Sequence, residues 1–186
     1  NEDIQSAFEV LRHGGILLYH TDTVWGIGCD ATNSAAVDKI YRLKQRSDSK
    51  SMIILVDLPG RIPSYVASVP DIAWDLIELS NKPLTIIYPK AKNLAKNLVA
   101  EDGSIGIRVV MHEFCQKLIQ KLGKPIVSTS ANISGQPSPK RIGEISGKIK
   151  NGVDFIVPEI YDKPLHDKPS SIIAIGEGNL INVIRE

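Results

Sequence analysis

The chain has 186 residues, enough for one domain with a substantial buried core. Its composition, with 42% hydrophobic and 23% charged residues, is ordinary for a soluble globular protein. The 22 basic and 21 acidic side chains leave a net charge of +1, which argues against a protein that coats nucleic acid by charge alone.

The cysteines and the apolar runs indicate the cellular compartment in which we expect the protein. Cys29 and Cys115 lie far apart in the sequence and lack metal-like spacing, so we expect two buried thiols in a reducing compartment. The longest apolar runs are far too short to cross a bilayer, and no charged-then-apolar signal segment opens the chain. We therefore expect a soluble, cytoplasmic protein without membrane contact.

In the first half of the chain, apolar spacing predicts two helices and two strands. A helix over residues 4–11 precedes the stop signal Gly14–Gly15, and a short buried strand follows over 16–19. Asn33 or Ser34 can cap a second helix that reaches residue 41. Residues 52–56 are expected to form another buried strand.

In the second half of the chain, predicted helices and strands alternate less regularly. We expect helices over 70–79, 113–122 and 139–149, and strands over 84–88, 104–110, 125–129, 155–157, 171–175 and 180–184. Several late strands lack helices between them, which favours a mixed α/β fold over a regular doubly wound sheet. The prediction is one domain over residues 1–186, a twisted, mixed open sheet with flanking helices.

The usual nucleotide and hydrolase signatures are missing from the sequence. It contains neither a G-x-x-x-x-G-K-[ST] loop nor a complete G-x-G-x-x-G turn, and Gly26-Ile27-Gly28 alone is weak evidence for phosphate binding. Metalloprotease, esterase and thioredoxin-like patterns are also absent.

Three polar segments remain as candidate sites. The first, His20 to Gly28, follows a strand and presents hydroxyls and a carboxylate, or else forms a turn whose side chains satisfy local backbone groups. The second is Ser104–Arg108, in which Arg108 ends an apolar strand. The third is Ser128–Asn132, which follows a buried strand and so lies where ligands of open α/β sheets collect. An isolated Arg108 would face solvent or a carboxylate, and a capped helix start is the alternative for Ser128–Asn132.

A basic segment lies between residues 42 and 50. In extended geometry Lys44 and Arg46 project to the same side, about 7 Å apart, and could straddle a polyphosphate. The alternative is a cationic helix C-terminus, favoured by the helix dipole and left in solvent.

Taken in order, these segments resemble the YrdC/TsaC family of threonylcarbamoyl-AMP synthases. The family shows P-T-[DE]-T-x-[YW]-G-[LI], then K-x-R, P-L-T, an arginine-ended strand and S-x-N. The counterparts here are Thr21–Ile27, Lys44–Arg46, Pro83–Thr85, Ser104–Arg108 and Ser130–Asn132, so the resemblance spans nearly the whole chain. It implies a concave, positively lined cavity, in an enzyme that combines ATP, L-threonine and bicarbonate into threonylcarbamoyl-AMP and pyrophosphate.

The resemblance also implies roles for individual residues. Threonine would be held by Thr23, Arg108, Ser128 and Ser170. ATP and its phosphates would be held by Lys44, Arg46, Lys50, Ser104, Ser130, Asn132, Ser138 and Arg185, with Lys44 and Arg46 stabilising charge as pyrophosphate leaves. Mg²⁺ is expected to be coordinated by the phosphates and water rather than by a set of protein ligands. The intermediate would pass to a threonylcarbamoyl-transferase complex and tRNA through weak or transient contacts.

The sequence departs from the family pattern at several positions. His20 replaces the usual proline, and Ser47 and Ser51 replace prolines near K-x-R. Leu55 stands where some relatives carry a histidine near threonine, so that contact is not carried over. Because longer members continue into a linker and a second domain, we expect this chain to be the short, single-domain form.

Two other functions remain open at this point. A non-catalytic RNA-binding module is disfavoured by the small net charge and by an aromatic content of 5%, since single-strand binders need stacking platforms. A carbamoyl-transfer domain of the hydrogenase-maturation type shares the fold implied by the resemblance, but such domains usually sit inside much longer chains.

Overall fold

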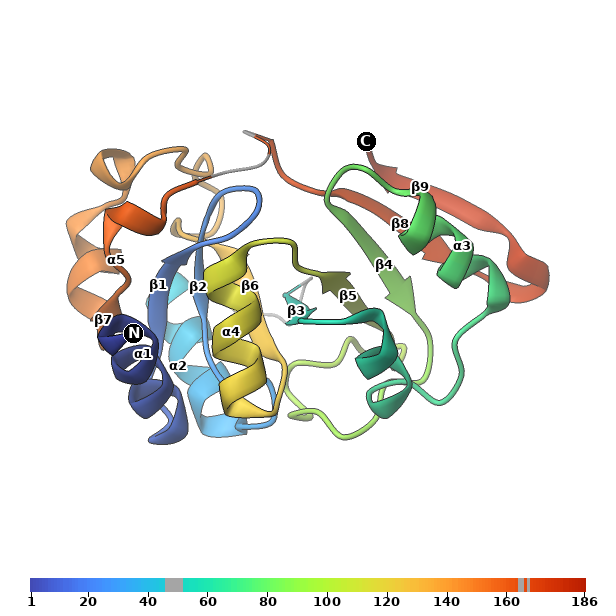
Figure 1. The fold of residues 1–186 in the computed structure, drawn as a ribbon, viewed down its shortest axis with the longest axis horizontal. Helices are drawn as coiled ribbons and strands as arrows, with labels where there is room; N and C mark the ends of the chain where they lie inside the picture. The colour runs from blue at the N-terminus through green and yellow to red at the C-terminus, as the bar shows by residue number, and fades with distance from the viewer. Residues whose placement is uncertain (46–51, 164–165, 167) are drawn as a thin grey trace.

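The computed structural model describes residues 1–45, 52–163, 166 and 168–186. Within them, nine strands form one open sheet in the order β7-β1-β2-β6-β3-β5-β4-β8-β9 (Figure 1). The strands are β1 (Leu17–His20), β2 (Trp25–Gly28), β3 (Ile53–Val56), β4 (Leu84–Tyr88), β5 (Ile105–Val109), β6 (Ile126–Ser130), β7 (Phe155–Ile156), β8 (Ser171–Ile175) and β9 (Ile181–Arg185). Parallel and antiparallel pairs alternate irregularly, so the predicted mixed, open α/β sheet is confirmed.

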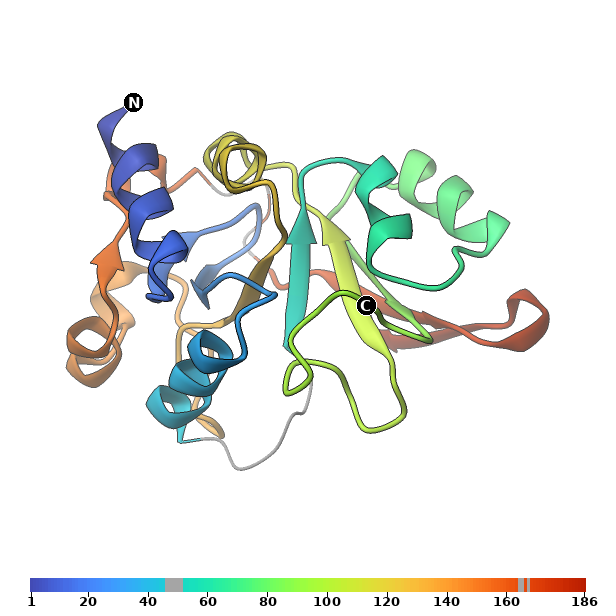
Figure 2. The same cartoon turned by 90° about the horizontal axis from the view of Figure 1, so that it is seen from below.

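Helices cover both faces of the sheet. The α-helices are α1 (Glu2–Arg12), α2 (Ser34–Lys44), α3 (Asp71–Leu79), α4 (Glu113–Leu122) and α5 (Gly147–Gly152). Figure 2 shows α1 and α4 on one side of the strands and α2 and α5 on the other. None of the helices in the described ranges is long and apolar enough to span a membrane. The short 3-10 helices are η1 (Pro59–Ser64), η2 (Ile142–Glu144), η3 (Glu159–Tyr161) and η4 (Glu177–Asn179).

The sheet separates two hydrophobic cores. One core packs apolar residues of α1 and α4, such as Leu11 and Leu118, against Leu17 and Leu55 on one face of the strands. The other core lies on the opposite face and includes Ile40 of α2. Alternate residues of a strand point to opposite faces, so neighbours such as Ile54 and Leu55 belong to different cores. This burial on both faces explains why β3 consists of apolar residues alone, whereas β9, at the edge of the sheet, is exposed throughout.

Residues 20–28, expected as a turn-bearing segment, form most of a β-hairpin. β1 and β2 pair antiparallel, with His20 opposite Trp25 and Leu17 opposite Gly28. The separate strand over Trp25–Gly28 was not anticipated, because two glycines in four residues weaken its apolar alternation. Gly28 is required by space, since an added Cβ would lie 2.4 Å from the Val127 main-chain oxygen.

The predicted helix over 139–149 is wrong in extent. The structure has the 3-10 turn η2, and α5 begins only at Gly147. The Ser146 side chain accepts a hydrogen bond from the main-chain NH of Ile149, so this serine caps a new helix. The short helix still covers the sheet, because Ile149 is fully buried in the second core.

Candidate functional site

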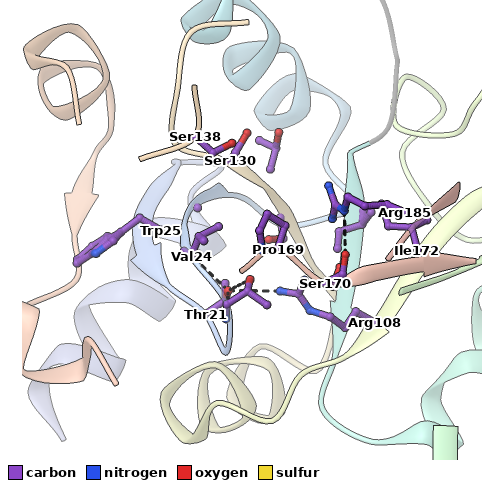
Figure 3. A pocket seen from close by; sticks show the side chains of 15 residues that line it. Thr21, Val24, Trp25, Arg108, Ser130, Ser138, Pro169, Ser170, Ile172 and Arg185 are labelled. Carbon is purple, nitrogen blue, oxygen red and sulfur yellow. Dashed lines mark hydrogen bonds between the residues drawn. The ribbon is translucent and has the colours of Figure 1, made fainter. Parts of the chain in front are cut away.

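A cleft of about 250 Å³ opens where the β1–β2 hairpin meets β6, β5 and β8 (Figure 3). It is lined by hydroxyl side chains, two arginines and a few apolar groups. The lining residues are Thr21, Thr23, Val24, Trp25, Gly26, Ile53, Arg108, Ser128, Thr129, Ser130, Ser138, Pro169, Ser170, Ile172 and Arg185. These residues come from chain segments that are far apart in the sequence, so only the folded sheet creates the cleft.

Arg108 is a buried cation at the base of the cleft. Its side chain leaves β5 and points toward the hairpin turn, where Nη2 lies 3.1 Å from Asp22 Oδ1 and donates to Thr21 Oγ1 at 3.3 Å (Figure 3). Asp22 is fully buried and also accepts a hydrogen bond from the Met111 main-chain NH. Arg108 Nε is buried without a hydrogen-bond partner among the described residues. The ion pair with Asp22 uses only one of the guanidinium nitrogens, so Arg108 is suited to bind a further anionic oxygen.

Hydroxyl groups surround this arginine. The Oγ1 atoms of Thr21 and Thr23 lie 3.0 Å apart within the hairpin turn. On the facing wall, the Ser170 hydroxyl lies 2.8 Å from Thr85 Oγ1, and both residues are buried. Hydroxyls can donate or accept, so this part of the cleft can serve both the ammonium and the carboxylate of an amino acid.

A second arginine enters the cleft from the last strand. Arg185 Nε donates to the Ser170 main-chain oxygen at 2.9 Å (Figure 3). Burial, and secondly the positive charge of Arg108, lower the pKa of Arg185 below its usual value. Two guanidinium groups that repel each other across one cleft favour an anionic ligand between them.

Lys44 approaches the site from the opposite side of β6. It is the last residue of α2 and is buried, with a side-chain exposure of 2%. Its Nζ donates to the main-chain oxygens of Ser130 and Asn132, the latter at 2.8 Å. The extended geometry assumed for Lys44 is therefore wrong. The alternative is right that Lys44 ends a helix with a basic last turn, and wrong that this lysine is left in solvent. Its ammonium supports the segment that follows β6.

The structure brings together most, but not all, of the residues expected at the site. Thr23, Arg108, Ser128, Ser130, Ser138, Ser170 and Arg185 line the cleft. Lys44 and Asn132 do not line the cleft, but the hydrogen bonds of Lys44 Nζ connect both to its wall at Ser130. Ser104 lies outside the lining and donates its hydroxyl hydrogen to Asp102 at 2.6 Å. Arg46, Lys50, Ser47 and Ser51 lie outside the described residues. The roles implied for these residues stay predictions.

Sequence reasoning missed several residues of the cleft and its support. Asp22 and Trp25 belong to a segment that was singled out, but their partners Arg108 and Asp162 lie far along the chain. Pro169 precedes Ser170, and Ile53 and Ile172 are apolar residues of predicted strands. No local signal marks these three as lining a cleft. Leu55, by contrast, is buried in the core on the α1 and α4 face.

The donor atoms at the site do not resemble a metal cage. Within the described ranges, no three His, Cys, Asp or Glu side chains are grouped so that they could hold a metal ion. Hydroxyls and arginines are the chemistry of anion binding instead.

Comparisons with known proteins point to one family. A family model described as "Telomere recombination" and named for Sua5, YciO and YrdC matches residues 9–186. A threonylcarbamoyl-AMP synthase of Pseudoalteromonas translucida is 36% identical over 174 residues, covering 91% of this chain and 91% of that protein. A threonylcarbamoyl-AMP synthase of Photobacterium profundum is 33% identical over 159 residues, covering 84% of this chain and 86% of that protein.

Two solved structures share the fold along nearly the whole chain. E. coli YciO superposes with a TM-score of 0.84 at 26% identity, covering 98% of this chain and 88% of that chain. P. abyssi Sua5 complexed with L-threonine has a TM-score of 0.82 at 26% identity, covering 94% of this chain. Here the match extends over only 51% of the Sua5 chain, about half its length.

Proposed function

Because the chain belongs to the Sua5/YciO/YrdC family, as its motifs predicted, we propose that it is a threonylcarbamoyl-AMP synthase. In this proposal it combines ATP, L-threonine and bicarbonate into threonylcarbamoyl-AMP and pyrophosphate, as the first step of tRNA threonylcarbamoyladenosine formation. The relatives named threonylcarbamoyl-AMP synthase support this activity and favour neither an RNA-binding module nor a carbamoyl-transfer domain.

The observation that carries the proposal is the buried Arg108 with an unpartnered Nε in a hydroxyl-lined cleft. A guanidinium group binds a carboxylate through parallel hydrogen bonds, so Arg108 would hold the carboxylate of threonine. Thr23, Ser128 and Ser170 lie on the surrounding walls and would receive the remaining polar groups. Holding the carboxylate at Arg108 keeps it from reacting and leaves the amine free.

The reaction then depends on the free amine. The amine lone pair attacks the carbon of CO2 derived from bicarbonate and loses a proton, which forms a carbamate. A carbamate oxygen attacks the α-phosphorus of ATP, the bond to the bridging oxygen breaks, and pyrophosphate leaves with that electron pair. The chain's contribution would be positioning and charge neutralisation, which are the main terms in nucleotidyl transfer.

The phosphates would lie toward Arg185, Ser130 and Ser138, which line the same cleft as Arg108. Lys44 would hold the main chain around Ser130 in place while Arg46 and Lys50 complete the phosphate contacts. The described residues offer hydroxyls rather than carboxylates to a metal, so Mg²⁺ would enter with ATP, coordinated by phosphates and water. When bound, Mg²⁺ supplies charge neutralisation to the phosphates.

The test is pyrophosphate release and product mass in the presence of ATP, Mg²⁺ and threonine. We expect no adenylate in CO2-depleted buffer and threonylcarbamoyl-AMP once bicarbonate is added back. Full activity before the addition would contradict the carbamate mechanism, because it would mean that the threonine carboxylate itself attacks ATP. Serine lacks one methyl group and should react less well, since one methyl is worth about 1–3 kcal/mol of discrimination.

The product is a reactive mixed anhydride, so it would pass directly to a threonylcarbamoyl-transferase complex and tRNA through transient contacts. We place this step in the cytoplasm, where tRNA is modified. The two buried free thiols, Cys29 and Cys115, are compatible with a reducing compartment.

A further inference from the structure

A buried cluster behind the cleft joins the β1–β2 hairpin to the chain that precedes β8. His20 and Trp25 lie opposite each other in the hairpin register and contact edge to face, with ring centroids 5.5 Å apart. Both side chains are nearly inaccessible to solvent. Neither has a role in the chemistry proposed above, although Trp25 lines the cleft.

Asp162 binds both rings with its two carboxylate oxygens. Oδ1 lies 2.9 Å from His20 Nε2, and Oδ2 accepts a hydrogen bond from Trp25 Nε1 at 3.2 Å. On the far side, His112 Nε2 lies 2.8 Å from the Tyr161 main-chain oxygen. These contacts hold the residues around Asp162 against the hairpin and the start of α4.

The chain that carries Asp162 continues to two residues of the cleft wall, Pro169 and Ser170. The His166 main-chain NH donates to the Asp22 main-chain oxygen at 3.2 Å, next to the ion pair with Arg108. At its end, Ser170 bonds to Thr85 and Arg185. Asp162 is thus the anchor for His20 and Trp25, the two residues that flank the hairpin turn with Thr23 of the proposed threonine site.

From these contacts we propose that His20 and Asp162 are positioning residues for threonine binding, acting through the β1–β2 hairpin, whose turn carries Thr23 and the Asp22 partner of Arg108. This inference rests on the proposed function. Position 20 is a proline in the sequence pattern that the chain resembles, and a proline ring has no donor for a carboxylate. The His20–Asp162 contact is therefore a feature of this chain's own residues rather than of the shared motif.

The main test compares variants by their KM for threonine and for ATP. Asp162→Ala and His20→Ala should each raise the KM for threonine about tenfold, the loss expected for one hydrogen bond to a charged group, with little change in the KM for ATP. His20→Gln keeps a neutral N–H donor and should restore most of the threonine affinity. The double variant should be no worse than the more severe single variant, because both remove the same contact.

The matched control is Asp154→Ala. Its carboxylate accepts a hydrogen bond from the Ile16 main-chain NH at 2.8 Å, just before β1 and away from the cleft. This variant should lose stability without changing the KM for threonine. Equal KM values for threonine in wild type and in Asp162→Ala, or an equal rise in Asp154→Ala, would overturn the positioning role.

A second measurement does not depend on activity. The chain has two tryptophans, so Trp74→Phe leaves Trp25 as the only indole fluorophore. In that background Asp162→Ala should shift the Trp25 emission to longer wavelength, because the indole loses its partner and gains solvent. His20→Gln should not cause this shift. If wild type fails to bind threonine but the emission shift occurs, the proposed function is wrong and the contact of Asp162 with Trp25 is confirmed. An unshifted emission in Asp162→Ala would show that Asp162 does not hold Trp25 in place.

The histidine also predicts a dependence on pH. Burial lowers the pKa of His20 below its usual value, opposed by Asp162 and Asp22 and reinforced by His112, while Cys115 Sγ donates to the His20 main-chain oxygen. The unfolded chain then binds the proton more readily, so stability is lost as pH falls below about 6.5. Wild type should lose more thermal stability than His20→Gln between pH 7.5 and 5.5. An equal loss would contradict a neutral His20 donor.

Discussion

The positive charge of Arg108 is paired with one carboxylate, that of Asp22, while its Nε has no hydrogen-bond partner among the described residues. Asp22 supplies a buried counter-charge, and the Met111 main-chain NH and the hairpin turn fix that carboxylate in place. A buried ion pair contributes little to net stability, because desolvation of both ions offsets their attraction. Its value here is geometric, since it orients the guanidinium group toward the cleft before a ligand arrives.

This arrangement determines how an Arg108 variant should be designed. Arg108→Ala would leave Asp22 buried without a counter-charge, at a cost of about 3–5 kcal/mol in the free energy of unfolding. Arg108→Lys keeps the charge but loses the planar fork, so we expect the KM for threonine to rise about tenfold or more. In Arg185→Ala, the KM for ATP should rise instead. Steady-state kinetics with each substrate varied would test this, and equal effects of Arg108→Lys on both substrates would contradict the assignment.

Lys44 allows a matched comparison within one helix. Lys44→Ala removes the donor to the Ser130 and Asn132 main-chain oxygens, which should cost about 1–3 kcal/mol in stability and weaken ATP binding about tenfold. The control is Lys39→Ala, since Lys39 Nζ makes a similar bond to the Gly14 main-chain oxygen away from the cleft. Calorimetry should show unchanged ATP affinity in the control. Unchanged affinity in Lys44→Ala as well would remove Lys44 from the nucleotide site.

At the scale of elements, the β1–β2 hairpin positions more of the site than any single helix. Its turn holds Thr21 and Asp22, and its second strand contributes Trp25 and Gly26 to the cleft. β2 also pairs with β6, with Gly26 opposite Ser130, so the hairpin sets the distance between two walls of the cleft. Close packing of β2 against its neighbours is therefore necessary for the site.

Gly28 provides a test of that packing. An added Cβ would lie 2.4 Å from the Val127 main-chain oxygen and 2.6 Å from Tyr19 Cε1, so Gly28→Ala should destabilise the fold by about 1–3 kcal/mol. Gly60→Ala is the control, because nothing lies within 4 Å of its added Cβ. Urea denaturation measures both. Equal stability of the two variants would mean that the strands can shift apart without cost.

Elements with strong local signals were predicted well. The helix over 113–122 and the strands over 84–88 and 171–175 have the predicted bounds, since apolar spacing, Gly123 and flanking turn residues mark them clearly. The helix expected over 139–149 failed, because Pro139 and two glycines weaken helical propensity and only Ser146 provides a cap. The strand β2 was not predicted for a similar reason, because its pairing with β1 and β6, rather than its composition, makes it a strand.

At the scale of the whole molecule, charge limits what the protein can bind. A net charge of +1 gives no general attraction to nucleic acid, and the two arginines of the cleft are committed to one concave site. We therefore expect the proposed transfer to tRNA to involve weak, transient contacts.

We accordingly expect tRNA binding to be weak and to fall steeply as salt increases. Phosphate contacts are lost through counterion competition, and few aromatic side chains are present to replace them by stacking. Filter binding or fluorescence anisotropy at several salt concentrations would measure this. A tight, salt-resistant complex with one RNA sequence would favour the RNA-binding module over a catalytic role.

The sequence by itself determined the family, the mixed α/β class and seven of the fifteen residues that line the cleft. These follow from local patterns, because apolar spacing and short motifs are properties of neighbouring residues. The tertiary structure alone decided which distant groups meet. Asp22 pairs with Arg108, Lys44 is buried against the Ser130 main chain, and Asp162 reaches His20 and Trp25. Those contacts depend on strand order and register, which arise from burial across the whole sheet rather than from any one segment.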